Sequence, residues 1–215
     1  MVFLNKTIVM GVFVYKRVSF FLTDFFVKNN FIPKEKKDIY TYGFELLTSS
    51  VVYALIFLFC ALITSTLYVS IIFFLGFYLV RKFCGGYHAN TYVKCNLISI
   101  FSHLIAIALI LWFPNSHIPL FNILTLFVCA FIILLFAPVD HKNKRFIKNE
   151  YRIFKIKSCI YSCIILILAV LNTIRIPLTV TFDKYIFAYS IGTLSATISM
   201  ICARIVNFKE RRKST

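Results

Sequence analysis

The sequence predicts an all-α integral membrane protein with about six transmembrane helices. Hydrophobic residues make up 60% of the 215 residues, whereas a soluble domain contains about 45–50%. Residues 46–80 form an apolar run of 35 residues without a single charge. The net charge of +16 is carried by short segments between such runs. This distribution is typical of membrane orientation rather than nucleic-acid binding, so we expect a lipid bilayer and no nucleic acid as partners.

The chain is predicted to form one polytopic membrane domain over residues 1–215. In residues 1–40, apolar residues alternate with charged ones, and no uncharged run can cross a hydrocarbon layer of about 30 Å. We therefore expect amphipathic helices lying in the membrane interface over this segment. Transmembrane helices are expected within residues 42–206, and residues 207–215 form a basic tail.

The membrane spans follow from the lengths of the apolar runs. A single helix over residues 46–80 would be about 52 Å long, which is too long for one span. We expect a helical hairpin over 42–63 and 65–81, with its turn at the polar residues Thr64, Ser65 and Thr66. Four further spans are expected over residues 96–113, 120–137, 157–174 and 185–206.

Lysine and arginine predict the orientation of these spans. Of the 24 basic residues, 22 lie in residues 1–44, 81–95, 138–157 and 204–215, which six alternating spans place on one side. Only Arg175 and Lys184 remain for the other side. The positive-inside rule therefore predicts that both termini and residues 81–95 face the cytoplasm.

Residues 81–95, the polar segment, hold the candidate chemistry. Cys95 is a candidate nucleophile and His88 its general base, with nearby basic residues favouring the thiolate. On a continuous helix these two residues would lie about 10.5 Å apart, so catalysis requires the chain to fold back between them. Gly85 and Gly86 permit an irregular or re-entrant loop here.

Other interpretations of the polar segment stay open. His88 is alternatively an interfacial polar residue, and Cys95 a small helix residue. Cys84 is a rival nucleophile. Cys84, His88, Cys95 and His103 also form a conceivable metal set, but their spacing fits no common zinc pattern. We therefore expect no metal and no cofactor.

Two motifs carry a family resemblance. Arg81-x4-Gly86-x-His88-x6-Cys95, placed after two apolar spans, resembles the motif of the accessory gene regulator B family. These membrane proteases process quorum-sensing propeptides in Gram-positive bacteria. Residues 137–140, Ala-Pro-Val-Asp, followed by Lys144, resemble a second family element. Cys84 departs from the pattern, because a small residue is expected before the Gly-Gly pair.

The resemblance implies a cysteine endopeptidase acting at the cytoplasmic side of the cell membrane. Cys95 would cut a short propeptide near its C-terminus and hold the N-terminal part as a thioester, with His88 as base. A Cys or Ser of the propeptide would then form a thiolactone or lactone, giving an autoinducing peptide. The family also implies a homodimer and a propeptide with an amphipathic leader and an acidic tail.

Supporting roles are assigned to further residues. Arg81 is expected to pair with a carboxylate or polarise the scissile carbonyl, and Glu45 to orient His88 or pair with Arg81; both have a plain alternative as charges that set topology or begin a helix. Backbone N–H groups beside Gly85 and Gly86 are candidate oxyanion donors. The candidates for a third catalytic group also include Asn90, Asn96 and Asp140. The basic residues expected to bind the acidic tail are Lys142, Lys144, Arg145 and Lys148.

A second functional class remains possible from sequence. A small transporter or lipid-binding membrane protein would use polar groups inside the membrane as a substrate path. The predicted spans hold few ionisable residues and show no evident inverted repeat, which favours the peptidase.

Overall fold

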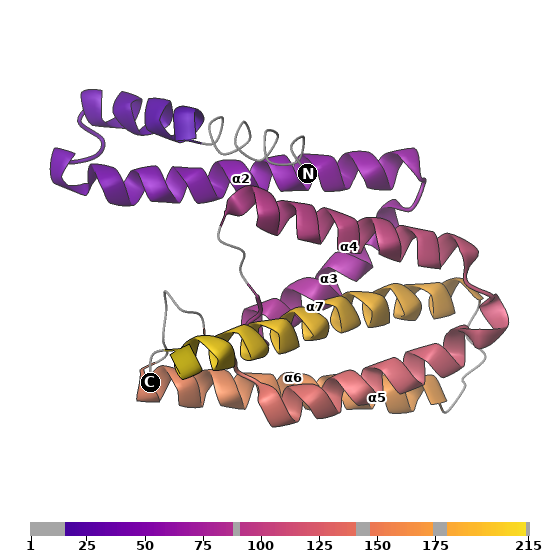
Figure 1. Cartoon of the computed structure of the whole chain (residues 1–215). Coiled ribbons are helices and arrows are strands. Elements are labelled where there is room, and N and C mark those ends of the chain that lie inside the picture. Colours follow the sequence, from indigo (N-terminus) through magenta and orange to yellow (C-terminus); the bar gives the residue numbers. More distant parts are fainter. Residues whose placement is uncertain (1–15, 88–90, 141–146, 174–179, 214–215) are drawn as a thin grey trace. The chain divides into compact units, whose positions relative to one another are not determined.

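The computed structural model describes residues 16–87, 91–140, 147–173 and 180–213, and every regular element within them is a helix. A helix over residues 16–28 is followed by two short 3₁₀ helices and six long α-helices (Figure 1). In chain order these are η1 (Lys34–Lys36), α2 (Lys37–Ile63), α3 (Leu67–Cys84), α4 (Tyr92–Trp112), η2 (Asn115–His117), α5 (Ile118–Phe136), α6 (Lys148–Thr173) and α7 (Val180–Lys213). Within the described ranges, α2 to α7 are long and apolar enough to cross a membrane, which confirms the predicted all-α membrane architecture.

The helix boundaries extend beyond the predicted spans. The turn between α2 and α3 lies at Thr64–Thr66 as expected, and the Thr66 carbonyl accepts the Ser70 N–H at 2.8 Å. α4, in contrast, begins four residues before the predicted position 96, and α7 continues past 206 to Lys213. Hydropathy marks only the apolar part of a helix, because the backbone hydrogen bonds continue into polar sequence wherever propensity allows.

The described residues form two compact units, which we treat separately. Unit 1 contains the helix over 16–28, η1, α2 and the start of α4 as far as Phe101. Unit 2 contains α3, the remainder of α4 from Ser102, and α5 to α7. The polar segment is therefore divided between the units, with Arg81 in unit 2 and Cys95 in unit 1.

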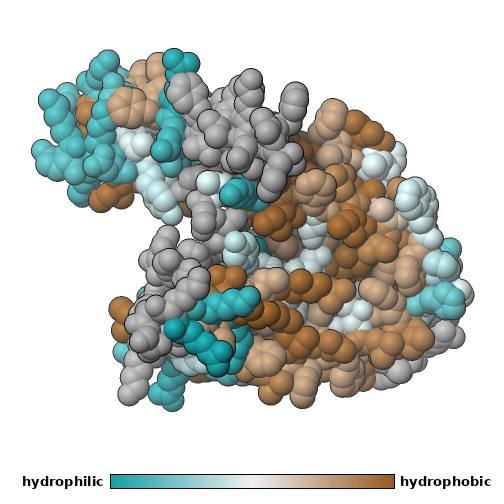
Figure 2. Space-filling model, viewed as in Figure 1, coloured by the Kyte–Doolittle hydropathy of each residue, from teal (hydrophilic) through white to brown (hydrophobic). Residues whose placement is uncertain are grey.

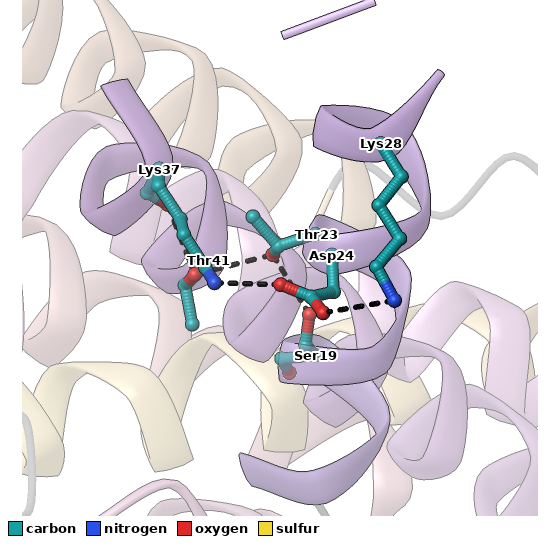
Figure 3. Close-up of polar contacts among 6 residues, drawn as sticks. All are labelled: Ser19, Thr23, Asp24, Lys28, Lys37 and Thr41. Atoms are coloured by element: carbon teal, nitrogen blue, oxygen red, sulfur yellow. Dashed lines mark hydrogen bonds and ion pairs between the residues drawn. The ribbon is translucent and has the colours of Figure 1, made fainter. Parts of the chain in front are cut away.

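In unit 1, the helix over 16–28 packs against the start of α2 through polar and aromatic contacts. Lys37 Nζ donates to Asp24 Oδ1 at 2.6 Å, and the Thr41 hydroxyl donates to Thr23 Oγ1 at 3.2 Å (Figure 3). The rings of Phe26 and Phe44 stack with their centroids 5.5 Å apart. The amphipathic N-terminal segment is thus a helical hairpin over its described part.

In unit 2, α7 packs along α3 and α5, and α6 packs against α5. Glycines bring α3 and α7 together: a Cβ added at Gly76 would lie 2.6 Å from the Tyr189 carbonyl oxygen, and one at Gly192 would meet the Phe73 carbonyl oxygen. Small residues commonly allow such close backbone approach between membrane helices. The large buried side chains of the core include Val80, Leu126, Ile133, Tyr161, Ile165 and Met200.

The surface of unit 2 separates apolar from charged side chains. Exposed apolar residues cover the spans; examples are Leu124, Phe131, Ile160 and Ile198. Figure 2 shows hydrophilic side chains gathered where α6 begins and α7 ends. This separation is expected for helices whose middle parts contact lipid and whose ends reach the headgroups and water.

Candidate active site

The polar segment begins where α3 ends in a glycine turn. Gly85 has φ +84°, a conformation that side chains with a Cβ rarely adopt. A Cβ at this position would also meet the Val139 carbonyl oxygen, and the Val139 N–H donates to the Cys84 carbonyl at 3.0 Å. The two motifs noted in the sequence therefore pack against each other, and the Ala137–Asp140 segment supports the end of α3.

Side chains of α6 and α7 also bind the Ala137–Asp140 segment and the end of α5 that precedes it. Lys155 Nζ donates to the carbonyls of Leu134 and Ala137, both at 2.8 Å, and so caps the C-terminal end of α5. Asn207 Nδ2 of α7 donates to the Asp140 carbonyl at 2.7 Å. Neither role was predicted, since both are set by contacts between helices distant in the sequence.

After the glycine turn, the chain is fixed to α7 through Ser199. The Tyr87 N–H donates to the Ser199 carbonyl and to Ser199 Oγ, both at 3.1 Å. Arg81 Nη1 donates to Ser199 Oγ at 3.2 Å, and Nη2 donates to the Tyr87 carbonyl at 3.0 Å. A Cβ on the buried Gly86 would lie 3.3 Å from Ser199 Oγ and 3.5 Å from Arg81 Cζ, so a small residue fits best here.

Two N–H donors of Arg81 thus bind Ser199 and Tyr87. The predicted pairing of Arg81 with a carboxylate or with the scissile carbonyl stays a prediction. The guanidinium also lies over the Phe77 ring, with Cζ 5.5 Å from the centroid. Ser199 was absent from the sequence-based candidates, because a serine 118 residues away on another apolar helix carries no local signal.

Cys95 lies at the start of α4, in unit 1. The Cys95 N–H donates to the Thr91 carbonyl at 3.1 Å, and the Lys94 N–H donates to Thr91 Oγ1 at 3.3 Å. This is the geometry of an N-cap, so Thr91 starts the helix and places Cys95 in its first turn. The Cys95 side chain is partly exposed.

Next to Cys95, Asn96 links α4 to α2. Its Nδ2 donates to the Ser49 carbonyl at 3.1 Å and to Ser49 Oγ at 3.0 Å. Glu45 lies one turn before Ser49 on α2, and its side chain is half-buried. No ion pair of Glu45 is found among the described residues, so its predicted partnership with His88 or Arg81 stays a prediction.

Several predicted residues lie outside the described ranges. They are His88, Asn90, Lys142, Lys144 and Arg145. The His88–Cys95 pairing and the basic binding loop therefore stay predictions. The predicted irregular loop can be followed from Gly85 to Tyr87, which are not helical.

The structure weakens both alternative uses of Cys84. Its thiol is fully buried in the core of unit 2, which disfavours attack on a peptide. His103 binds Ser70 through Nε2 at 2.9 Å, and Ser70 precedes Cys84 by 14 residues on α3. That separation is about 21 Å along the helix, so Cys84 and His103 do not ligate one ion.

Comparison with known proteins assigns the family. The family model described as Accessory gene regulator B matches residues 20–202. The chain is 30% identical over 114 residues to an AgrB-like protein of Listeria monocytogenes serotype 4a (strain HCC23), and 32% identical over 114 residues to one of Listeria innocua serovar 6a. Each alignment covers 52% of this chain and 53% of the relative, so the chain spans about half the length of the curated relatives it matches. No solved structure matches the chain.

The family match spans most of the described helices and both motifs. It includes the polar segment with Cys95 as well as the Ala137–Asp140 segment. Together with the six helices of the described ranges that are able to cross a membrane, it indicates a multi-pass membrane protein. This chain therefore belongs to the accessory gene regulator B family.

Proposed function

We propose that this protein is a membrane cysteine endopeptidase that processes a signalling propeptide and promotes its cyclisation. The observation that carries the proposal is the position of Cys95, which is partly exposed in the first turn of a capped helix. Cys84, the other thiol of the polar segment, is buried. A nucleophilic thiol requires access to its substrate, and of the two thiols Cys95 is the one that meets this condition.

The reaction has two acyl-transfer steps. His88 takes the proton of Cys95, and the thiolate attacks the scissile carbonyl carbon. The C–N bond breaks, the leaving amine takes the proton, and the N-terminal part of the propeptide remains on Cys95 as a thioester. A thiol or hydroxyl within the bound peptide then attacks the same carbonyl and closes the ring, its proton passes through His88 to the departing sulfur, and Cys95 is released as the thiol. Proximity favours this internal nucleophile over water.

Thiol chemistry suits the second step energetically. A thioester keeps most of the reactivity of its acyl group, so transfer to another thiol is nearly balanced in free energy. An oxyester on a serine enzyme would be more stable, and transfer back to a thiol would be uphill. Restricted access of water at the membrane edge would protect the thioester until the ring closes.

Other groups support the reaction in this proposal. Arg81 holds the Tyr87 carbonyl. The backbone N–H groups of Gly85 and Gly86 are candidate oxyanion donors, whereas the Tyr87 N–H is bound by Ser199. Glu45 supports His88. The loop residues Lys142, Lys144 and Arg145 attract the acidic tail of the propeptide. The polar segment and both termini face the cytoplasm, and the protein acts as a homodimer.

Acyl-enzyme formation tests the proposal directly. The purified protein is mixed with a candidate propeptide, a short peptide with an internal Cys or Ser and an acidic C-terminal tail, and intact masses are measured for wild type, Cys95→Ala, His88→Ala and Cys84→Ala. We expect a hydroxylamine-sensitive adduct in wild type and Cys84→Ala, none in Cys95→Ala, and at least a hundredfold slower acylation in His88→Ala, which is about the contribution of a general base.

The control variant is Cys202→Ala, because Cys202 is exposed on α7 and lies outside the polar segment. It should acylate like wild type. Loss of the adduct in Cys84→Ala but not in Cys95→Ala would refute the assignment of the nucleophile. If peptide uptake into vesicles occurs and Cys95→Ala leaves it unchanged, while no variant cleaves, a transporter is the better description.

A further inference from the structure

We infer that Ser199, on the last membrane helix, is a positioning residue for the general base of the proposed peptidase. The inference rests on the proposed function, in which His88 activates Cys95. Ser199 contacts Arg81 and Tyr87, and Tyr87 is the residue that precedes His88 in the chain.

Both backbone polar groups of Tyr87 are fixed by the same arrangement. Its N–H is bound by the carbonyl and hydroxyl oxygens of Ser199, and its carbonyl is bound by Arg81 Nη2 at 3.0 Å. Because a peptide unit is planar from one Cα to the next, fixing the Tyr87 carbonyl restricts the starting point of the following residue. A base must approach its nucleophile within roughly 2.6–3.2 Å, so small displacements of this starting point matter.

The use of the Ser199 hydroxyl differs from that of other hydroxyl groups on α7. Ser190 Oγ donates to the Ile186 carbonyl and Thr197 Oγ1 donates to the Thr193 carbonyl, so both bind the preceding turn of their own helix. Ser199 Oγ instead accepts two hydrogen bonds from another segment, one from Tyr87 N–H and one from Arg81. Because the Arg81 guanidinium is charged, its hydrogen bond to Ser199 Oγ is stronger than one between neutral groups.

The position also joins the polar segment to a rigid part of unit 2. Met200, which follows Ser199, and Ala196, three residues before it, both belong to the buried core of unit 2. α7 packs along α3, which carries Arg81, so the two partners of Tyr87 are held by the same helix pair. A rigid support of this kind is what a catalytic side chain in a loop requires to keep its geometry.

The test measures the thiolate of Cys95 without any peptide substrate. The full-length protein in detergent is treated with iodoacetamide between pH 5.5 and 9.5, and alkylation of the Cys95-containing peptide is followed by mass spectrometry. We compare wild type, Ser199→Ala, Ser199→Thr, His88→Ala and the matched control Ser190→Ala, whose hydroxyl binds only its own helix.

We expect Ser199→Ala to slow alkylation at pH 7 about tenfold and to move the pH profile toward that of His88→Ala. Ser199→Thr, which keeps the hydroxyl, should recover most of the wild-type rate, and Ser190→Ala should match wild type. Acylation by the candidate propeptide should fall by a similar factor in Ser199→Ala, through the rate at saturating peptide rather than through its apparent affinity.

Gly86→Ala provides a second perturbation of the same contact, because its Cβ would lie 3.3 Å from Ser199 Oγ. It should shift the Cys95 profile in the same direction, even if Ser199→Ala does not fold. If folded Ser199→Ala and Gly86→Ala both show the wild-type pH profile while alkylation in His88→Ala is slowed, the role of Ser199 is refuted and the base assignment of His88 stands. A wild-type profile in His88→Ala overturns the base assignment of the proposed function itself.

Discussion

Gly76 lies at a close approach of α3 and α7, and Gly76→Ala tests how tightly these helices pack. A Cβ at this position would lie 2.6 Å from the Tyr189 carbonyl oxygen and 3.2 Å from the Thr193 backbone nitrogen. Ordinary van der Waals contact begins at 3.4 Å, so the helices would separate locally by about 3.4 − 2.6 = 0.8 Å. Two of the obstructing atoms belong to the backbone and do not move by a change of rotamer.

The expected free-energy change combines two opposing effects. Overpacking a rigid site costs about 1–3 kcal/mol, and the upper end applies because backbone atoms obstruct the new methyl group. Alanine is favoured over glycine within a helix by about 1 kcal/mol. The net destabilisation of Gly76→Ala is therefore about 2 kcal/mol. For a chain of this size, about 2–4 °C of Tm corresponds to each kcal/mol, so Tm should fall by about 4–8 °C.

Thermal unfolding of the purified protein in detergent measures this effect. The control is Gly43→Ala in α2, where an added Cβ has no neighbour within 4 Å and should leave Tm equal or higher. Gly192→Ala should resemble Gly76→Ala, and the double variant should lose less than the sum, because one separation of the helices serves both methyl groups. A Gly76→Ala protein that melts at or above the wild-type Tm would show that this contact is not close-packed.

Two further predictions concern polar contacts away from the proposed nucleophile. Lys155→Met removes both hydrogen bonds to the last carbonyls of α5 and should destabilise the protein by about 1.5–3 kcal/mol. The control Lys157→Met changes an exposed side chain and should have little effect. Equal Tm values for the two variants would contradict the capping role of Lys155. In the N-terminal hairpin, the hydrogen bond from Lys37 is the main cause that lowers the pKa of Asp24 below its usual 3.8. The stabilisation of the N-terminal hairpin by this carboxylate is therefore complete above pH 3.8 and is lost as pH falls through its lowered pKa. Hydrogen exchange of the helix over 16–28, corrected for intrinsic rates, should accordingly accelerate in acid for wild type. Asp24→Asn should remove most of this pH dependence, and an unchanged dependence would assign it to other groups.

The sequence alone determined the membrane class, the number of spans and the turn between α2 and α3. These properties depend on residues that are neighbours in the sequence. The length of each apolar run is compared with the thickness of the bilayer, and polar residues that interrupt an uncharged run mark its turns. The polar residues Thr64 to Thr66 were sufficient to divide a 35-residue uncharged run into two helices. The order of Arg81, Gly86 and Cys95 likewise indicated the family that the comparison then assigned.

Helix starts were less predictable than spans, and Thr91 shows why. Residues 90–93 have poor helix propensity, so an irregular or re-entrant loop was expected here and the next span was expected to begin at residue 96. The Thr91 hydroxyl accepts the Lys94 N–H and begins α4 earlier, which moves Cys95 into the first turn. A capping side chain forms hydrogen bonds with individual backbone N–H groups, and a hydropathy profile contains no information about these bonds.

Only the tertiary structure separated the two thiols of the polar segment. Cys84 and Cys95 both lie near glycine, histidine and basic residues in the sequence, yet Cys84 is fully buried and Cys95 is partly exposed. The difference arises because α3, which carries Cys84, packs against α6 and α7, so that the Cys84 side chain lies in the core of unit 2.

Only the tertiary structure, too, identified the partners of Arg81 and the reason for Gly85. Arg81 binds Ser199, 118 residues away, and Gly85 packs against the Val139 carbonyl of the second motif. Sequence periodicity reports which face of one helix is apolar but does not report which residue of another helix faces it. The candidate residues of the polar segment could therefore be chosen from the sequence, whereas their contacts with distant helices could be identified only from the tertiary structure.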